Sequence, residues 1–158
     1  MPPRKIDPAR LLAALSEQRV QLGEPPWTGQ LSPAVLGSAC VTAVLSAVDA
    51  GQQPAREALR AAVTYLLDAL ADRVPGRAVE VRVPPFAAVQ CVPGPRHTRG
   101  TPPNVVETDP MTWLALAVGR LDWAAAAASG AVRASGPRSD ISGYLPLAGE
   151  RPGQRHLH

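Results

Sequence analysis

The apolar residues of this chain repeat with two different periods, and the change of period divides the sequence. From 54 to 74 they recur every three or four positions with charged residues on the other side, which is typical of an amphipathic helix. After Gly76 the period becomes two, because Val79, Val81 and Val83 stand at alternate positions, as in a half-buried strand. The pattern predicts helices first and a sheet that begins near residue 79.

Two cap-and-proline pairs predict earlier helices. Asp7–Pro8 and Ser32–Pro33 each place a good N-cap before a proline at the first helical position, where the missing N–H costs nothing. The segment 33–48 carries no charge and spreads its apolar residues around the helix. We expect it to be a core helix, with a dimer face or a lid over a ligand as the alternatives.

Further strands are expected on either side of a proline-rich loop. Pro84 and Pro85 cannot donate ladder hydrogen bonds, so they indicate a bulge or a crossover before a second strand at 86–92. The segment 93–103 reads as a stiff loop, and 104–108 is expected to be the third strand.

The C-terminal part alternates short helices with one weak strand. Its expected elements are a helix after the Asp109–Pro110 cap that ends at Gly119, a helix after Asp122 that ends at Gly130, a strand at 131–135, and a last helical turn that Ser139 or Asp140 caps and that runs to Tyr144. Residues 149–158 are polar and are expected to be disordered. Strands in the middle, with helices before and after them, predict an α+β fold with a mostly antiparallel sheet.

The run 118–136, with Leu145 after it, resembles the C-terminal half of the sterol-carrier-protein family, in which a short helix, a Gly-basic-Leu step, another helix and a small-residue strand recur. The run 79–110 is similar to the actinobacterial branch of that family, and the resemblance covers roughly 54–148. It implies a five-stranded, mostly antiparallel sheet with helices packed on one face, and a hydrophobic tunnel for sterols or acyl chains. Residues 1–53 would form an extra helical extension packed on this domain.

A similar domain also forms the C-terminal part of mycothiol-dependent maleylpyruvate isomerase-like proteins, whose metal is bound by histidines in a separate helical bundle. Here the N-terminal helices contain no histidine, and the only three in the chain are His97, His156 and His158. We therefore expect no metal site of that kind and no cofactor.

Composition narrows the class of protein. A chain of 158 residues fits one domain with a real core, and with 46% hydrophobic but only 4% aromatic residues any pocket would be aliphatic. The 16 basic residues exceed the 13 acidic ones, yet they form no cluster with interleaved aromatics, so nucleic-acid binding is not expected. The first residues have bases but no apolar run of a secretory signal, which favours the cytoplasm. The charge-free segment is short for a membrane span, so no stable insertion is expected.

Two groups of residues are candidates for binding a ligand. The apolar lining of a pocket would come from Phe86, Val89, Met111, Trp113, Leu114 and Trp123, although the same residues would serve equally as core. Arg96, His97 and Arg99 lie in the proline-bounded loop with no acidic residue nearby in sequence, and they would bind the charged end of a ligand. The alternative is an exposed basic loop.

Two further groups of residues are weaker candidates, one for a catalytic site and one for a metal site. Cys91, His97 and Asp109 suggest a nucleophile, a base and an orienting group, but Cys91 reads better as a small core residue, and both cysteines are expected to be reduced. Asn104 and Glu107 with Asp109 are conceivable oxygen ligands, yet Asp109 already serves as a helix cap.

The sequence thus favours a non-catalytic protein that holds or shuttles a lipid-like or other hydrophobic small molecule. A homodimeric interaction module that uses 33–48, with no small-molecule ligand, is the first alternative. An unrecognised enzyme that uses the Cys91 and His97 region is the second.

Overall fold

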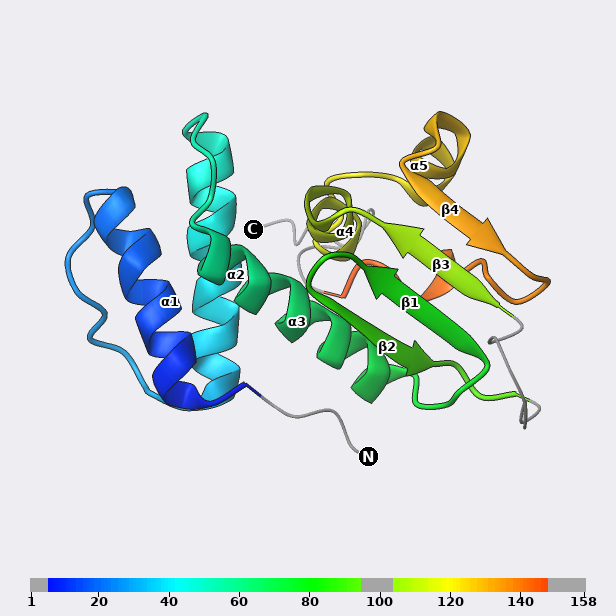
Figure 1. Cartoon of the computed structure of the whole chain (residues 1–158), viewed down its shortest axis with the longest axis horizontal. Coiled ribbons are helices and arrows are strands. Elements are labelled where there is room, and N and C mark those ends of the chain that lie inside the picture. The colour runs from blue at the N-terminus through cyan, green and yellow to red at the C-terminus, as the bar shows by residue number, and fades with distance from the viewer. Residues whose placement is uncertain (1–5, 95–103, 148–158) are drawn as a thin grey trace, which may run out of the picture. The chain divides into compact units, whose positions relative to one another are not determined.

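The computed structural model describes residues 6–94 and 104–147 (Figure 1). In chain order its elements are α1 (Pro8–Gln21), α2 (Pro33–Asp49), α3 (Arg56–Arg73), β1 (Val79–Val83), β2 (Ala87–Cys91), β3 (Val105–Thr108), α4 (Pro110–Ala117), α5 (Trp123–Ser129), β4 (Val132–Ser135) and the 3-10 helix η1 (Ser142–Tyr144). The chain forms two compact units, Met1–Tyr65 and Leu66–His158, so the boundary falls inside α3. The division expected from sequence, at 53/54 and 148/149, stays a prediction.

The first unit begins with the two helices that the cap-and-proline pairs predict. The Asp7 carboxylate accepts a hydrogen bond from the Ala9 N–H, and the Ser32 hydroxyl accepts one from the Val35 N–H. In Figure 1, α1 and α2 run in the same direction, because residues 22–32 return along the outside of the pair. The predicted starts of both helices are confirmed.

The charge-free helix α2 provides much of the core of the first unit. Leu36 and Cys40 of α2 are fully buried in one apolar cluster with Leu11 and Leu15 of α1. The expectation of a core helix is therefore confirmed for this side of α2. Gln18 of α1 is also fully buried, and its side-chain oxygen accepts a hydrogen bond from a backbone N–H just before α3.

The sheet of the second unit corrects the prediction from sequence. Within the described residues it has four strands in the order β2-β1-β3-β4, and β1 pairs with β3 in parallel, whereas the β1–β2 and β3–β4 pairs are antiparallel. The predicted five-stranded, mostly antiparallel sheet is therefore wrong in strand number. The sheet is mixed because β2 ends at the start of β1, where Cys91 pairs with Val79, and β3 begins at that same end on the other side of β1, where Val105 pairs with Glu80.

Pro84 and Pro85 do not form the bulge or crossover expected from sequence. They lie in a tight hairpin turn, where Val83 pairs with Ala87 and the Phe86 N–H donates to the Val83 carbonyl at 3.0 Å. The two prolines stand in the turn, where no ladder hydrogen bond is required of them.

Two further predicted caps of the second unit are present, whereas neither Ser139 nor Asp140 is the N-cap of η1, which is Ile141 and has no side-chain cap hydrogen bond. Asp109 caps α4 through the Thr112 N–H at 2.9 Å, and Asp122 caps α5 through the Ala125 N–H at 3.3 Å. Gly130 ends α5 with φ of 80°, in the left-handed region that glycine adopts without strain. No helix in the described ranges is long and apolar enough to cross a membrane.

Candidate functional site

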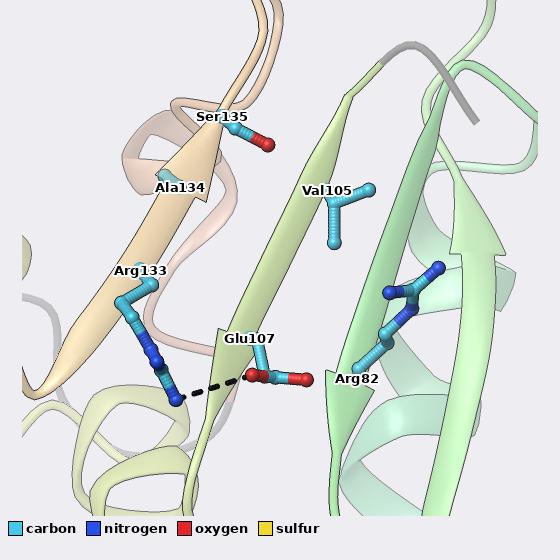
Figure 2. A pocket seen from close by; sticks show the side chains of 6 residues that line it. All are labelled: Arg82, Val105, Glu107, Arg133, Ala134 and Ser135. Atoms are coloured by element: carbon cyan, nitrogen blue, oxygen red, sulfur yellow. Dashed lines mark hydrogen bonds and ion pairs between the residues drawn. The ribbon is translucent and has the colours of Figure 1, made fainter. Parts of the chain in front are cut away.

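The sheet of the second unit has one apolar face, which we call the inner face. Val79, Val81 and Val83 of β1 are fully buried on it, and Val106 of β3 and Val132 of β4 are nearly so. Behind the strands in Figure 2 lies a helical ribbon, on the side opposite the labelled side chains. Alternation along the strands therefore separates a helix-covered apolar face from a polar one.

The apolar candidates from the sequence fall into two groups. Trp113 and Leu114 of α4 are each 1% exposed and Val89 of β2 is 8% exposed, so these three are core residues in this structure. Met111, in the first turn of α4, is 37% exposed, and the side chains of Phe86 and Trp123 are half-buried. Only the second group has surface that a ligand can reach without rearrangement.

Phe86 and Met111 come to the same edge of the sheet. Because β1 and β3 are parallel, the hairpin after β1 and the start of α4 after β3 both follow carboxyl ends of strands. A hollow of about 360 Å³ opens at this edge, and its lining residues are Pro84, Glu107, Thr108, Asp109, Gly130, Ala131 and Arg133. We call this region the carboxyl edge.

Arg96, His97 and Arg99 lie outside the described residues. After them, the buried Asn104 donates to the Ala78 carbonyl at 2.7 Å and accepts from the Arg138 N–H at 2.8 Å. Before them, the Pro93 carbonyl accepts from Nη1 of Arg138 at 3.2 Å. Anion binding by the three residues stays a prediction.

The structure gives Cys91 the character of a core thiol. It is fully buried at the end of β2, and burial raises its pKa to about 11, so the thiol is protonated at neutral pH. An activated cysteine has its pKa lowered instead. Cys40 has the same raised pKa of about 11 for the same reason, and both thiols are free.

Asp109 and Asn104 have structural partners rather than the arrangement of metal ligands. Partial burial tends to raise the pKa of Asp109, but hydrogen bonds from the Thr112 hydroxyl and from backbone N–H groups hold it below its usual value. In residues 6–94 and 104–147, no group of three or more His, Cys, Asp or Glu side chains is placed to bind a metal ion.

The polar face of the sheet, which we call the outer face, was not predicted from the sequence. There Arg82, Glu107 and Arg133 are directly opposite one another on β1, β3 and β4, and we call them the charged row. Figure 2 shows their side chains around a hollow of about 220 Å³ that Val105, Ala134 and Ser135 also line. The alternation of charged and apolar residues along β1 and β3 signals this face, but only the strand register joins its members.

A family model for bacterial SCP orthologs matches residues 55–147, which is more than half of the 158 residues. This match supports the resemblance to a sterol-carrier family. It gives no support to the relation with maleylpyruvate isomerase-like proteins. No curated protein matches the chain.

Proposed function

Because the chain belongs to the family of bacterial SCP orthologs, we propose that it is a non-catalytic binding protein of the cytoplasm that holds or shuttles a lipid-like or other hydrophobic small molecule. The observation that carries the proposal is the family match itself, since residues 55–147 contain all the strands that the structure describes and the apolar inner face of the sheet. The aliphatic composition of that face suits an apolar ligand better than an aromatic or charged one.

The carboxyl edge is the proposed entrance for the ligand. Phe86 and Met111 keep part of their surface accessible at this edge, where the hollow of about 360 Å³ also opens, although neither residue lines it. The volume of the hollow falls in the range of about 300–1,000 Å³ that is common for small-molecule pockets, but most of its lining residues (Glu107, Thr108, Asp109 and Arg133) are polar, so it serves as an entrance and not as the apolar chamber itself. An acyl chain that enters here would displace core contacts of Trp113 or Leu114 to reach the inner face, so partial opening is part of the proposal.

A displacement assay tests this function directly. The delipidated protein is titrated with a fluorescent fatty acid, and unlabelled fatty acids and sterols are then added as competitors. We expect saturable binding, and Met111→Lys is expected to weaken it about fivefold or more, because a charged group at the entrance opposes an apolar ligand. Val20→Lys is the matched control, since Val20 is 77% exposed and lies in the first unit. Absence of saturable binding in the wild-type protein would refute the proposal.

The charged end of the ligand is assigned to Arg96, His97 and Arg99 on the sequence alone. In the same assay, Arg96→Ala combined with Arg99→Ala is expected to weaken binding of an acyl carboxylate and to leave binding of the corresponding alcohol unchanged. Equal affinities of wild type and double variant for the carboxylate would remove this role.

A homodimer through α2 is the second candidate, and one hollow favours it. About 470 Å³ in volume, it has a largely uncharged wall, and its lining residues are Arg19, Glu24, Trp27, Ala34, Val35, Ser38, Ala39, Thr42, Ala43 and Ser46. Small side chains allow a second helix to approach closely. Light scattering across a concentration series tests it: a monomer at all concentrations excludes this candidate, and a dimer that Thr42→Arg dissociates supports it.

A further inference from the structure

The charged row contains a cation and an anion that are neighbours without being joined. Arg82 and Glu107 are directly opposite in the parallel β1–β3 register. Within the described part of the chain, however, each of them forms an ion pair with a different residue. Arg82 contacts Glu80 at 2.7 Å, and Glu107 contacts Arg133 at 3.2 Å. The opposite charges of Arg82 and Glu107 therefore face the same hollow separately (Figure 2).

Both charged groups keep hydrogen-bonding capacity for a ligand. Arg82 uses Nε and Nη2 on one carboxylate oxygen of Glu80, which leaves the Nη1 donors of its guanidinium. Glu107 uses Oε2 on Arg133, which leaves Oε1 as an acceptor. Arg133 thus holds the Glu107 carboxylate in place, while the side of that carboxylate toward Arg82 stays open.

The hollow also limits the size of what it can hold. Its volume is about 220 Å³, and because one water occupies roughly 30 Å³, it suits a group of roughly seven heavy atoms. Neighbouring strands lie about 4.8 Å apart, so the positive and negative groups of a complementary ligand would be separated by about 5 Å. Val105, two residues before Glu107 on β3 and opposite Glu80, lines the same hollow and presents apolar surface beside the two charges.

We propose that this hollow on the outer face binds a small zwitterion, with its phosphate or carboxylate at the Arg82 guanidinium and its ammonium at the Glu107 carboxylate. A free molecule such as O-phosphoethanolamine and a lipid headgroup of the same chemistry both meet this description. The site is exposed and its charges are screened by water, so binding is weak and selectivity for a zwitterion is its distinguishing property. This inference uses neither the inner face nor Met111, although Glu107 and Arg133 also line the hollow at the carboxyl edge.

The test compares matched probes by following backbone amide NMR shifts in β1 and β3. O-phosphoethanolamine is expected to bind two- to fivefold more tightly than inorganic phosphate, the gain of one exposed ion pair, and ethanolamine alone to bind less tightly than either. Shifts outside the outer face, or equal affinities for O-phosphoethanolamine and phosphate, would overturn the proposal.

Variants separate the two charges. Glu107→Gln is expected to abolish the preference for the zwitterion while phosphate still binds, and Arg82→Gln to weaken both probes. Arg77→Gln, an exposed arginine that does not line the hollow, is the control and should change neither. An unchanged preference in Glu107→Gln would contradict the assignment even if the wild-type selectivity is found.

Vesicles distinguish the two sources of the zwitterion. If vesicles that contain phosphatidylethanolamine bind the wild-type protein but do not bind the Arg82→Gln variant, the ligand is a lipid headgroup. If only free O-phosphoethanolamine binds, the ligand is a soluble molecule, and the site stands in both cases. The Met111→Lys variant of the carrier assay leaves these shifts unchanged, so failure of one proposal is distinguishable from failure of the other.

Discussion

Gly37 lies against the ring of Tyr65, and a Cβ atom added to Gly37 would overlap that ring. Glycine inside a helix normally costs about 1 kcal/mol relative to alanine, but Gly37, in the second turn of α2, leaves the space that this ring occupies. We expect Gly37→Ala to lower the free energy of unfolding by about 1–3 kcal/mol, as overpacking does. Urea denaturation followed by circular dichroism measures it.

Gly143→Ala is the control for that substitution. A Cβ atom on Gly143 meets nothing within 4 Å, so the change in stability is expected to stay within about 0.5 kcal/mol. A Gly37→Ala protein that is more stable than wild type would show that the Tyr65 ring moves aside freely.

Asn104 is expected to be the most sensitive polar residue of the second unit. Its buried side chain connects the segment before β1 to the segment after β4, through the Ala78 carbonyl and the Arg138 N–H. Asn104→Ala leaves both of these groups without that partner and should cost about 1–3 kcal/mol of stability. Gln90→Ala, on the exposed side of β2, is the comparison and should be nearly neutral. Equal melting temperatures for the two variants would contradict this role.

The two cysteines predict a loss of stability at alkaline pH. Burial raises the pKa of Cys40 and of Cys91 from the ordinary 9.0 to about 11. The folded chain therefore retains both thiol protons to higher pH than the unfolded chain does, and this contribution to stability is present below pH 9 and is lost as the pH rises toward 11. Denaturation midpoints measured across this range should decrease.

A variant with Cys40→Ala and Cys91→Ala provides the control for the alkaline titration. Its denaturation midpoint should decrease less than that of wild type, because the two thiols no longer titrate. Some decrease should remain, because other groups titrate in this range. At mildly alkaline pH, a thiol reagent should react with the native protein far more slowly than with the unfolded protein. Rapid reaction in the native state would show that one thiol is accessible.

The cap of α4 predicts a loss of stability at acidic pH. Hydrogen bonds from Thr112 and from backbone N–H groups outweigh partial burial and hold the pKa of Asp109 below the ordinary 3.8. The carboxylate thus contributes stability above that ordinary value, which is lost as the pH falls through the lower pKa of the folded state. Asp109→Ala should cost about 1 kcal/mol at neutral pH.

Asp109→Asn separates the cap from the charge. The amide oxygen can still accept from the Thr112 N–H, so Asp109→Asn should retain most of the neutral-pH stability but lose the acid-dependent part. Thermal melts at neutral pH and at about pH 3 compare the three proteins. If Asp109→Asn shows the same acid dependence as wild type, another carboxylate is responsible.

Local signals in the sequence predicted the elements well but not their arrangement. Asp7, Ser32, Asp109 and Asp122 each begin a helix because a cap acts on residues two or three positions away, within reach of any local reading. The direction of β3 relative to β1 depends instead on the path of the chain between them. Alternation of apolar residues contains no information on that path, and so the mixed sheet was not foreseen.

The same limit applies to the candidate sites. Trp113 and Met111 differ by two positions and both read as apolar candidates, yet one is 1% and the other 37% exposed, because only one of them faces the core from α4. The charged row was missed for a related reason. Arg82, Glu107 and Arg133 are far apart in sequence and become neighbours only through the register of three strands.

The central position of β1 has a consequence during synthesis of the chain. Once β2 has emerged from the ribosome, the β1–β2 hairpin can form, but β3 and β4 are made later, and until then the long edge of β1 that β3 will cover has free N–H and C=O groups. Such an edge is a template for pairing with another nascent chain. Between translation of residue 91 and residue 108, that edge of β1 is thus open to such pairing.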